Sequence, residues 1–422
     1  MAGRSGASRF RIAAVLSVGQ VGARGVLALY FILLIHRMSE REYGDFAYAM
    51  SWLAILIVLA DGGVSRLLLR DVARARADHG REAAPLLGAR SIWIAGTGVV
   101  AIAAGLAGIL RFDVSFMALL VAALALEAAS LGLEAVGQAA DSPWVVARAQ
   151  LLGAVVLAAW AVVLLVIDDV TPLLALAGIA LASGVRFAAQ AIHWRGRSGA
   201  TFAWPGTAPA LGVLRQALPY LLLGGLAALY YRLDIIILHI RRGALDTAPY
   251  AAAYRIVDAS LIAGAVLFTA VAPHLSRVIA DDPGSVRSEW RHYLVRVAAG
   301  AALLAVAIFV LAEPLSRVVF GERYAESAGE NLRLLAPGIA FMLVQMVNAS
   351  VVLMGDTQRT VVRLTLLAVA VNAVLTWILA GEYGARGASI ATSATEVFTF
   401  TTFVFVVRAA YKPGIRRRPA GP

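Results

Sequence analysis

The sequence contains no cysteine and only one lysine, Lys412, among its 422 residues. The absence of cysteine excludes disulfide bonds, cysteine nucleophiles and thiolate metal sites. Charged residues make up only 15% of the chain, hydrophobic residues make up 60%, and the mean hydropathy is +0.79. These values lie well outside the range of soluble domains, so the sequence predicts a polytopic membrane protein.

Histidine is also scarce, and it is poorly placed for chemistry within the membrane. The six histidines lie at the ends of apolar runs or between them: His36, His79, His193, His239, His274 and His292. No predicted loop exceeds about 25 residues, so there is no room for a catalytic domain outside the bilayer. A polytopic glycosyltransferase or acyltransferase would need catalytic residues in a large external loop, or a histidine embedded in the membrane. We therefore expect a protein that is not an enzyme, with no catalytic residue, metal site or cofactor.

Twelve apolar runs are long enough to cross a bilayer as helices. They cover residues 11–35, 44–66, 91–110, 114–136, 147–167, 172–193, 212–240, 247–275, 293–320, 331–355, 361–381 and 387–411. The predicted fold is therefore all-α and membrane-integral.

The net charge of +11 is distributed between the runs. Basic residues are concentrated in the N-terminus, in the segments 66–90 and 276–296, and in the C-terminal tail, whereas the segment 321–330 is acidic. Basic loops lie preferentially on the cytoplasmic side. We expect an inner-membrane protein with both termini in the cytoplasm, and we expect no nucleic acid partner.

The two halves of the chain are weakly similar to each other. The segment YGDFAYA from Tyr43 resembles YAAAYRI from Tyr250, and RAQLLGAVVLAAWAVVLL from Arg148 resembles RLTLLAVAVNAVLTWIL from Arg363. Each pair is separated by about half the chain, which predicts two six-helix lobes related by a pseudo-twofold axis along the membrane normal. The predicted domains are an N-terminal lobe over 1–193, a cytoplasmic linker over 194–211, a C-terminal lobe over 212–411 and a basic tail over 412–422.

Four charges lie well inside the seventh and eighth runs. They are Arg232 and Asp234 in the first of these runs, and Arg255 and Asp258 in the second. Counted at about 1.5 Å per residue, Arg232 and Arg255 lie at a similar depth, roughly 12 Å from one surface. Two interpretations remain open, since these residues could form ion pairs that hold two helices together or could line a polar cavity for a charged substrate.

Further charges occur within other runs, where exposure to lipid would be costly. Arg24 is too deep to reach the surface easily, which favours a role in the cavity. Arg186 is shallow enough to extend toward the headgroups. Glu127 and Glu396 could balance the arginines or bind a coupling ion. Asp61 could pair with Arg66 or cap a helix end.

Three stretches resemble a known family. The first has LP at Leu218, RLD at Arg232, YRI at Tyr254 and APHLS at Ala272. The second is RMSEREYGDFAYAMSWLAILIVLADGGVSRLLLRDVAR from Arg37. The third runs from Leu335 and includes MGDTQRT, Asn372 and YGARGASIATSATE. Together they resemble the multidrug/oligosaccharidyl-lipid/polysaccharide (MOP) flippase superfamily, and within it the polysaccharide-synthesis branch of O-antigen flippase-like proteins.

The resemblance implies the MOP flippase fold and a flippase function. The expected substrate is a polyprenyl-pyrophosphate-linked oligosaccharide, such as an O-antigen unit of lipopolysaccharide, a capsule unit or an exopolysaccharide unit. A polymerase and glycosyltransferases of the same pathway are possible partners. The arginines suit this substrate because guanidinium groups stay protonated and bind phosphate in a bidentate manner. Arg24, Arg232 and Arg255 are the predicted substrate-binding residues.

Transport of this kind could be coupled to protons or sodium ions. Asp234, Glu127, Asp258 and Glu396 are the candidate ion-coupling or charge-balancing residues, and Asp61, Arg186 and Asn372 are further candidates for the site. The main alternatives are a cation-coupled multidrug exporter or a peptidoglycan-precursor flippase of the same superfamily. A drug exporter for cations would be poorly served by several arginines in its cavity.

Overall fold

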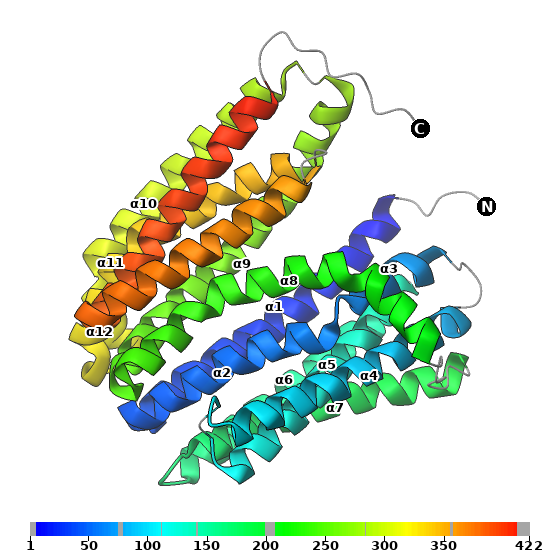
Figure 1. Cartoon of the computed structure of the whole chain (residues 1–422), viewed down its shortest axis with the longest axis horizontal. Helices are drawn as coiled ribbons and strands as arrows, with labels where there is room; N and C mark the ends of the chain where they lie inside the picture. The colour runs from blue at the N-terminus through cyan, green and yellow to red at the C-terminus, as the bar shows by residue number, and fades with distance from the viewer. Residues whose placement is uncertain are drawn as a thin grey trace. The chain divides into compact units, whose positions relative to one another are not determined.

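The computed structural model describes residues 6–74, 79–110, 112–140, 142–198, 207–282, 284–354 and 358–411. Every regular element within these residues is a helix (Figure 1). The helices are α1 (Gly6–Arg37), α2 (Glu40–Asp61), α3 (Val64–Arg74), α4 (His79–Leu106), α5 (Val114–Ala139), α6 (Pro143–Val166), α7 (Pro172–Ser198), α8 (Thr207–Arg242), α9 (Ala244–Asp281), α10 (Val286–Phe320), α11 (Glu322–Met354) and α12 (Gln358–Ala410).

Eleven of these helices, all except α3, are long enough and apolar enough to span a membrane. The prediction of an all-α, multi-pass membrane protein is therefore confirmed. The predicted tail 412–422 and part of the predicted linker, residues 199–206, lie outside the described residues.

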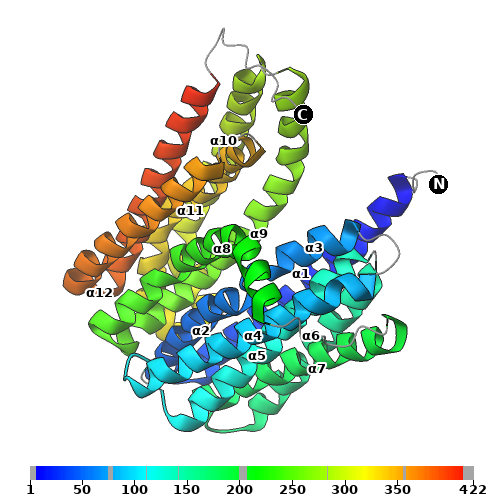
Figure 2. The same ribbon diagram turned by 45° about the vertical axis from the view of Figure 1, so that its right-hand side comes forward.

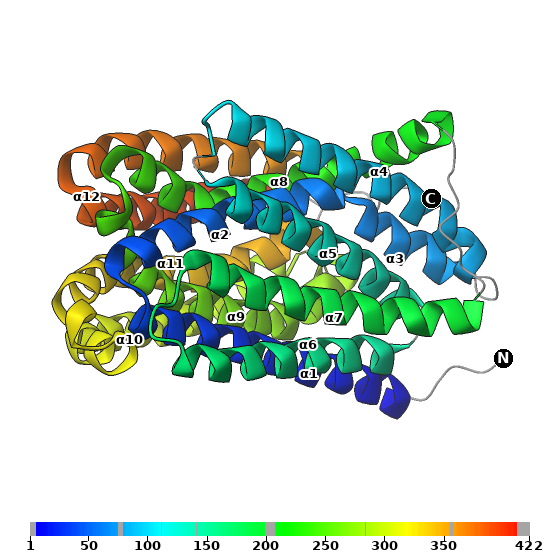
Figure 3. The same cartoon turned by 90° about the horizontal axis from the view of Figure 1, so that it is seen from below.

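The chain divides into two compact units, Met1–Ala228 and Leu229–Pro422, which we call unit 1 and unit 2. In unit 1, α6 packs between α1 and α7, and α5 packs against α7, as Figure 3 shows. In unit 2, α11 packs against α9, α10 and α12 (Figure 2). The boundary between the units falls within α8, so its N-terminal part belongs to unit 1 and its C-terminal part to unit 2.

Two segments that the sequence placed in loops are helical in their described parts. Residues 66–74 form most of α3, residues 79–90 form the start of α4, and residues 322–330 form the first turns of α11. In α3, Arg66, Arg70 and Arg74 lie four residues apart and are exposed, while Leu67 and Leu68 are buried. Such spacing makes a helix with one basic face and one apolar face. Its average hydropathy is low, which is why it resembled a loop.

A pair of glycines joins α2 to α3. Gly62 caps α2 in the left-handed conformation with φ 58°, and Gly63 follows with φ 75°. A β-carbon on Gly63 would lie 2.6 Å from the carbonyl oxygen of Ala217 in α8. The chain can turn and pack closely here only because neither residue has a side chain.

A third glycine divides α12 into two membrane crossings. At about 1.5 Å per residue, its 53 residues would make a rod far longer than a bilayer is thick. Gly384 has φ 59° and ψ −134°, and the two halves of α12 run side by side in Figure 1. The break at Gly384 separates the predicted eleventh and twelfth spans.

We expect Gly384→Ala to lower the stability of unit 2 by about 1–3 kcal/mol, because its backbone lies in a region that other residues occupy only under strain. A β-carbon there would also lie 2.4 Å from Asp246 Oδ2. Thermal unfolding in detergent measures this effect. Gly300→Ala in α10 is the matched control, since nothing lies within 4 Å of its added carbon. Equal stability of the two variants would contradict the prediction.

Candidate functional site

A cluster of two arginines and one aspartate lies within the membrane-spanning part of unit 2. Arg232 of α8 contacts Asp258 Oδ1 at 3.1 Å, and Arg255 of α9 contacts Asp258 Oδ2 at 3.2 Å. The Arg232 guanidinium also lies 5.9 Å from the ring centre of Tyr254. All three charged side chains are partly exposed, between 14% and 24%. Ion pairs between these two helices, one of the two interpretations that the sequence left open, are therefore present. The three side chains together carry one net positive charge.

Asp234 lies apart from this cluster, although it is only two residues from Arg232. It is 1% exposed. The hydroxyl of Tyr250 in α9 donates a hydrogen bond to its Oδ2, Thr392 of α12 lies 3.3 Å from the same atom, and the backbone N–H of Ile235 donates to Oδ1 at 2.8 Å. Within the described residues, its carboxylate makes no ion pair within 4 Å. Asp234 is thus a buried acid held by neutral donors.

Glu396 forms a second site of the same kind. It is 6% exposed, and its Oε1 accepts a hydrogen bond of 2.9 Å from the hydroxyl of Tyr230. Tyr230 and Asp234 lie one turn apart on α8, and Thr392 and Glu396 lie one turn apart on α12. The buried carboxylates of Asp234 and Glu396 therefore lie one turn apart where α8 meets α12.

Asn372 adds a polar side chain to the same region of α12. It is 3% exposed, its Nδ2 donates to Thr395 Oγ1 at 3.4 Å, and its Oδ1 is buried without a hydrogen-bond partner. A buried carboxylate can bind a proton or a small cation, because either one neutralises the charge that burial disfavours. An amide oxygen can be a further ligand of the cation. The described residues contain no group of three or more histidine, aspartate or glutamate side chains arranged to hold a metal ion.

The predicted residues of unit 1 form separate features. Glu127 of α5 pairs with Arg186 of α7 and accepts a hydrogen bond of 2.6 Å from Ser183. Arg24 lies on an exposed face of α1. The structure therefore assigns Glu127 and Arg186 to one ion pair, and Arg24 to the surface of unit 1.

Asp61 belongs to a buried network at the joint between α2 and α3. It pairs with Arg90 of α4, whose side chain is 2% exposed, and Ser65 donates to Asp61 Oδ1 at 2.5 Å. Arg90 also donates to the carbonyl oxygen of Ala128 at 2.6 Å. The sequence suggested Arg66 as the partner of Asp61 because Arg90 appeared to lie in a loop.

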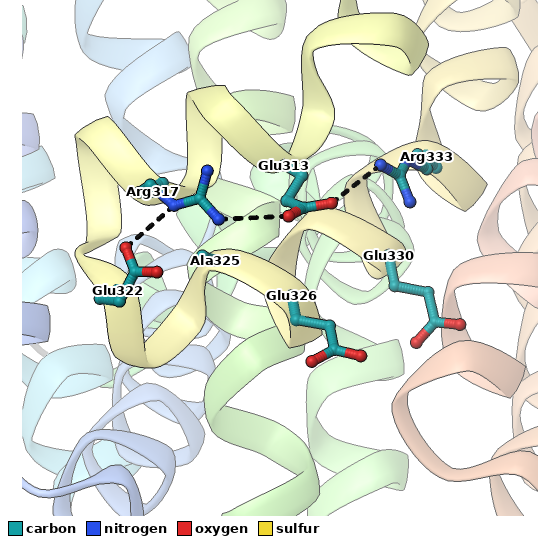
Figure 4. Close-up of a pocket in the computed structure, with 7 residues that line it drawn as sticks. All are labelled: Glu313, Arg317, Glu322, Ala325, Glu326, Glu330 and Arg333. Atoms are coloured by element: carbon teal, nitrogen blue, oxygen red, sulfur yellow. Dashed lines mark hydrogen bonds and ion pairs between the residues drawn. The ribbon is translucent and has the colours of Figure 1, made fainter.

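A pocket of about 380 Å³ lies where α10 meets α11, and Figure 4 shows its charged lining. Arg317 contacts Glu313 at 3.3 Å and Glu322 at 2.9 Å, and Arg333 contacts Glu313 at 3.3 Å. Glu330 contacts Arg386 of α12 at 2.7 Å. These surface pairs tie three helices together, and such exposed pairs contribute little stability each.

Sequence reasoning missed several polar residues in the spans. Tyr230 and Tyr250 were not recognised as partners of the buried acids, because tyrosines within apolar runs are common. Glu134 was also missed, although it lies inside the predicted span 114–136, two turns after Glu127. A complete count of charges within the runs would have found Glu134.

Comparison with known proteins places the chain in a family. Residues 11–279, well over half of the chain, match the family described as polysaccharide biosynthesis protein. A search of curated proteins finds no match.

Solved structures share the fold at low sequence identity. An inward-facing multidrug resistance MATE transporter of the MOP superfamily is 13% identical, with 92% of this chain and 99% of that chain covered and a TM-score of 0.69. The lipid II flippase MurJ in an inward closed conformation is 12% identical, with 94% and 87% covered and a TM-score of 0.72. A MOP transporter from Pyrococcus furiosus, titled as having a binding pocket of reverse polarity, is 14% identical, with 95% of each chain covered and a TM-score of 0.65.

The solved structures are so different in sequence that they establish only the fold. The family match rests on the sequence of residues 11–279 and establishes the family. The chain belongs to the polysaccharide biosynthesis protein family and has the fold of MOP superfamily transporters.

Proposed function

We propose that this protein is an alternating-access flippase of the inner membrane. It moves a polyprenyl-pyrophosphate-linked oligosaccharide, such as an O-antigen, capsule or exopolysaccharide unit, from the cytoplasmic to the outer leaflet. Both termini lie in the cytoplasm, as the basic loops indicate. A polymerase and glycosyltransferases of the same pathway would act before and after it.

The cluster of Arg232, Arg255 and Asp258 is the observation that carries this proposal. Its net positive charge lies within membrane-spanning helices, where an isolated charge facing lipid would cost at least about 2.5 kcal/mol. A pyrophosphate group supplies the missing negative charge, and guanidinium groups bind it with fixed geometry. Arg24 of unit 1 is a further proposed substrate contact. Family membership supports a substrate that carries a glycan.

The test uses the purified full-length protein in proteoliposomes. A labelled polyprenyl-pyrophosphate oligosaccharide is added to one leaflet, and its arrival in the other leaflet is measured by access to a glycan-cleaving enzyme. Translocation that depends on the protein supports the proposal. Failure to bind or translocate this lipid under any ion gradient overturns it. Dye efflux in the same vesicles, without lipid transport, would instead support a multidrug exporter.

The buried carboxylates of unit 2 are the proposed coupling site. Asp234 and Glu396 lie where α8 meets α12, and the side chains that hydrogen-bond to them are neutral hydroxyl groups. A carboxylate in this position must alternate between charged and neutralised states as access changes. Asp258 is bound to two arginines and Glu127 to one, so these two residues serve charge balance rather than coupling.

We expect Asp234→Asn to remove most of the dependence of transport on an ion gradient. Asparagine keeps the size of the side chain and can still accept the Tyr250 hydrogen bond, but it cannot be neutralised by a cation. Transport rates are measured with a pH gradient and, separately, with a sodium gradient. Asp246→Asn is the matched control, because that aspartate is exposed and paired with Arg242. An unchanged gradient dependence in Asp234→Asn would rule out this coupling site.

A further inference from the structure

Unit 1 contains a buried carboxylate that the proposed transport cycle does not use. Glu134 of α5 is 8% exposed. Its Oε1 accepts two hydrogen bonds from amide groups, one of 2.9 Å from Gln150 of α6 and one of 3.1 Å from Gln138 one turn away. Within the described part of the chain, Glu134 makes no ion pair within 4 Å, in contrast to Glu127 on the same helix.

Gln150, which binds Glu134, has an amide oxygen that lacks a hydrogen-bond donor. Gln150 is 6% exposed, and its Oε1 is buried without a hydrogen-bond partner, although its Nε2 is bound to Glu134. Buried acceptors are nearly always paired in native structures. An ionised carboxylate cannot supply a donor, whereas a protonated one carries an O–H group. A proton on Glu134 would place an O–H donor on the carboxyl group that the Gln150 amide already contacts.

A second buried amide lies at the same level of unit 1. Glu127 bonds Ser183, and Gly137 lies close to Trp194, so α5 and α7 run side by side in the same direction. Gln190 follows Ser183 by two turns, as Glu134 follows Glu127. Gln190 is 1% exposed, and neither polar atom of its amide has a partner. Gln190 thus adds a buried amide, with both its donor and its acceptor unpaired, at this level of unit 1.

Two arginines that contact α5 are paired with other carboxylates. Arg186 of α7 pairs with Glu127, and Arg90 of α4 pairs with Asp61 of α2. Further titratable or charged residues on the neighbouring helices near this end are Arg66, Arg70, Asp71 and Arg74 of α3, His79, Arg81 and Glu82 of α4, Arg148 of α6, and His193, Arg195 and Arg197 of α7. Of these, Arg66, Arg70, Arg74, Arg148 and Arg195 are exposed. Two neutral amides do not offset the cost of burying a full charge.

We propose that Glu134 is a proton-binding site in unit 1, separate from the carboxylates of unit 2. Glu134 is held as a neutral carboxylic acid between Gln138 and Gln150. It lies five residues before the end of α5, roughly 8 Å from it at the rise of a helix. Water can reach this position when that end of unit 1 opens, and the proton then exchanges with the aqueous phase.

Infrared difference spectroscopy of the purified full-length protein tests the proposal without a transport assay. The spectrum of Glu134→Gln is subtracted from that of the wild type near neutral pH. We expect the difference to contain the C=O stretching band of a protonated carboxyl group, with a shift in D₂O, and no carboxylate bands. The band should decrease as the pH rises. Glu127→Gln is the control, because its ion pair predicts the loss of carboxylate bands instead.

Carboxylate bands in the Glu134 difference would overturn the proposal, since they would show an ionised side chain. If those bands changed on removal of sodium, the site would bind a metal cation rather than a proton. If Glu134→Gln fails to fold, Glu134→Asp can replace it. This variant shifts the band of the carboxyl group rather than removing it, so the difference spectrum still shows whether the group is protonated or ionised. The result is independent of whether the protein translocates a lipid-linked oligosaccharide.

Discussion

Arg255→Ala is expected to lower transport of the lipid-linked oligosaccharide by about tenfold to a hundredfold, the effect of losing one charged hydrogen-bonded contact. Arg255 shares Asp258 with Arg232, so its removal leaves that cluster neutral. A neutral cluster has no excess charge for a pyrophosphate group. The side chain of Arg255 is 14% exposed, which places it at a surface rather than in the core.

Lysine at this position separates charge from geometry. Arg255→Lys keeps the positive charge but lacks the planar fork that binds phosphate with two parallel hydrogen bonds. We expect it to restore only part of the activity. The measurement is the amount of surface glycan and of accumulated lipid-linked intermediate in cells at equal protein abundance, followed by vesicle transport. Arg242→Ala is the control, because Arg242 is an exposed residue paired with Asp246.

Full activity in both Arg255 variants would show that this residue is structural. The substrate contact would then have to be sought at Arg24, which lies about midway along α1 and is exposed. Loss of activity with alanine and retention with lysine would mean that charge alone matters. Loss with both would point to a bidentate phosphate contact.

Asp61→Asn is expected to be the most destabilising of the substitutions considered, with a loss of about 3–5 kcal/mol, because it removes one partner of a buried ion pair. Arg90 would then remain buried, at 2% exposure, without its counterion. Its remaining contacts, with Ser65 and the carbonyl oxygen of Ala128, are both to neutral groups. Unfolding in increasing detergent denaturant, followed by loss of helical signal, measures the change.

Arg90→Leu tests whether the charge itself causes the loss. We expect the double variant Asp61→Asn with Arg90→Leu to be more stable than Asp61→Asn alone, because it contains no unpaired buried charge. Arg70→Ala is the control, since Arg70 is exposed, pairs with the adjacent Asp71 and should change stability by about 1 kcal/mol or less. A loss in Asp61→Asn no larger than in this control would mean that the network contributes nothing.

The membrane class and most of the crossings could be predicted from the sequence, because both depend on local hydrophobicity. The two errors have one cause. In residues 66–90 and 322–330, charged residues lower the average hydropathy even where they line one face of a helix, so α3 and the first turns of α11 resembled loops. The buried position of Arg90 could not be predicted, because it depends on Asp61, which lies 29 positions earlier in the chain.

The sequence also showed which charged residues lie within the membrane spans, but it did not show their ion-pair or hydrogen-bond partners. Arg232 and Asp234 lie two residues apart and so point to different sides of α8. Only packing decides that Arg232 meets Asp258 of α9, while Asp234 meets Tyr250 and Thr392. The same holds for Glu396, whose partner Tyr230 is 166 residues away.

The all-helical membrane fold, the membership of the polysaccharide biosynthesis family and the arginines within the spans could all be read from the residues in chain order. Hydrophobic run length and charge depth are local properties, so they do not depend on which segments pack together. The pairing of the charges required the tertiary structure. That outcome depends on helix rotation and on contacts between distant segments, such as the meeting of Glu134 with Gln150 or of Asp61 with Arg90.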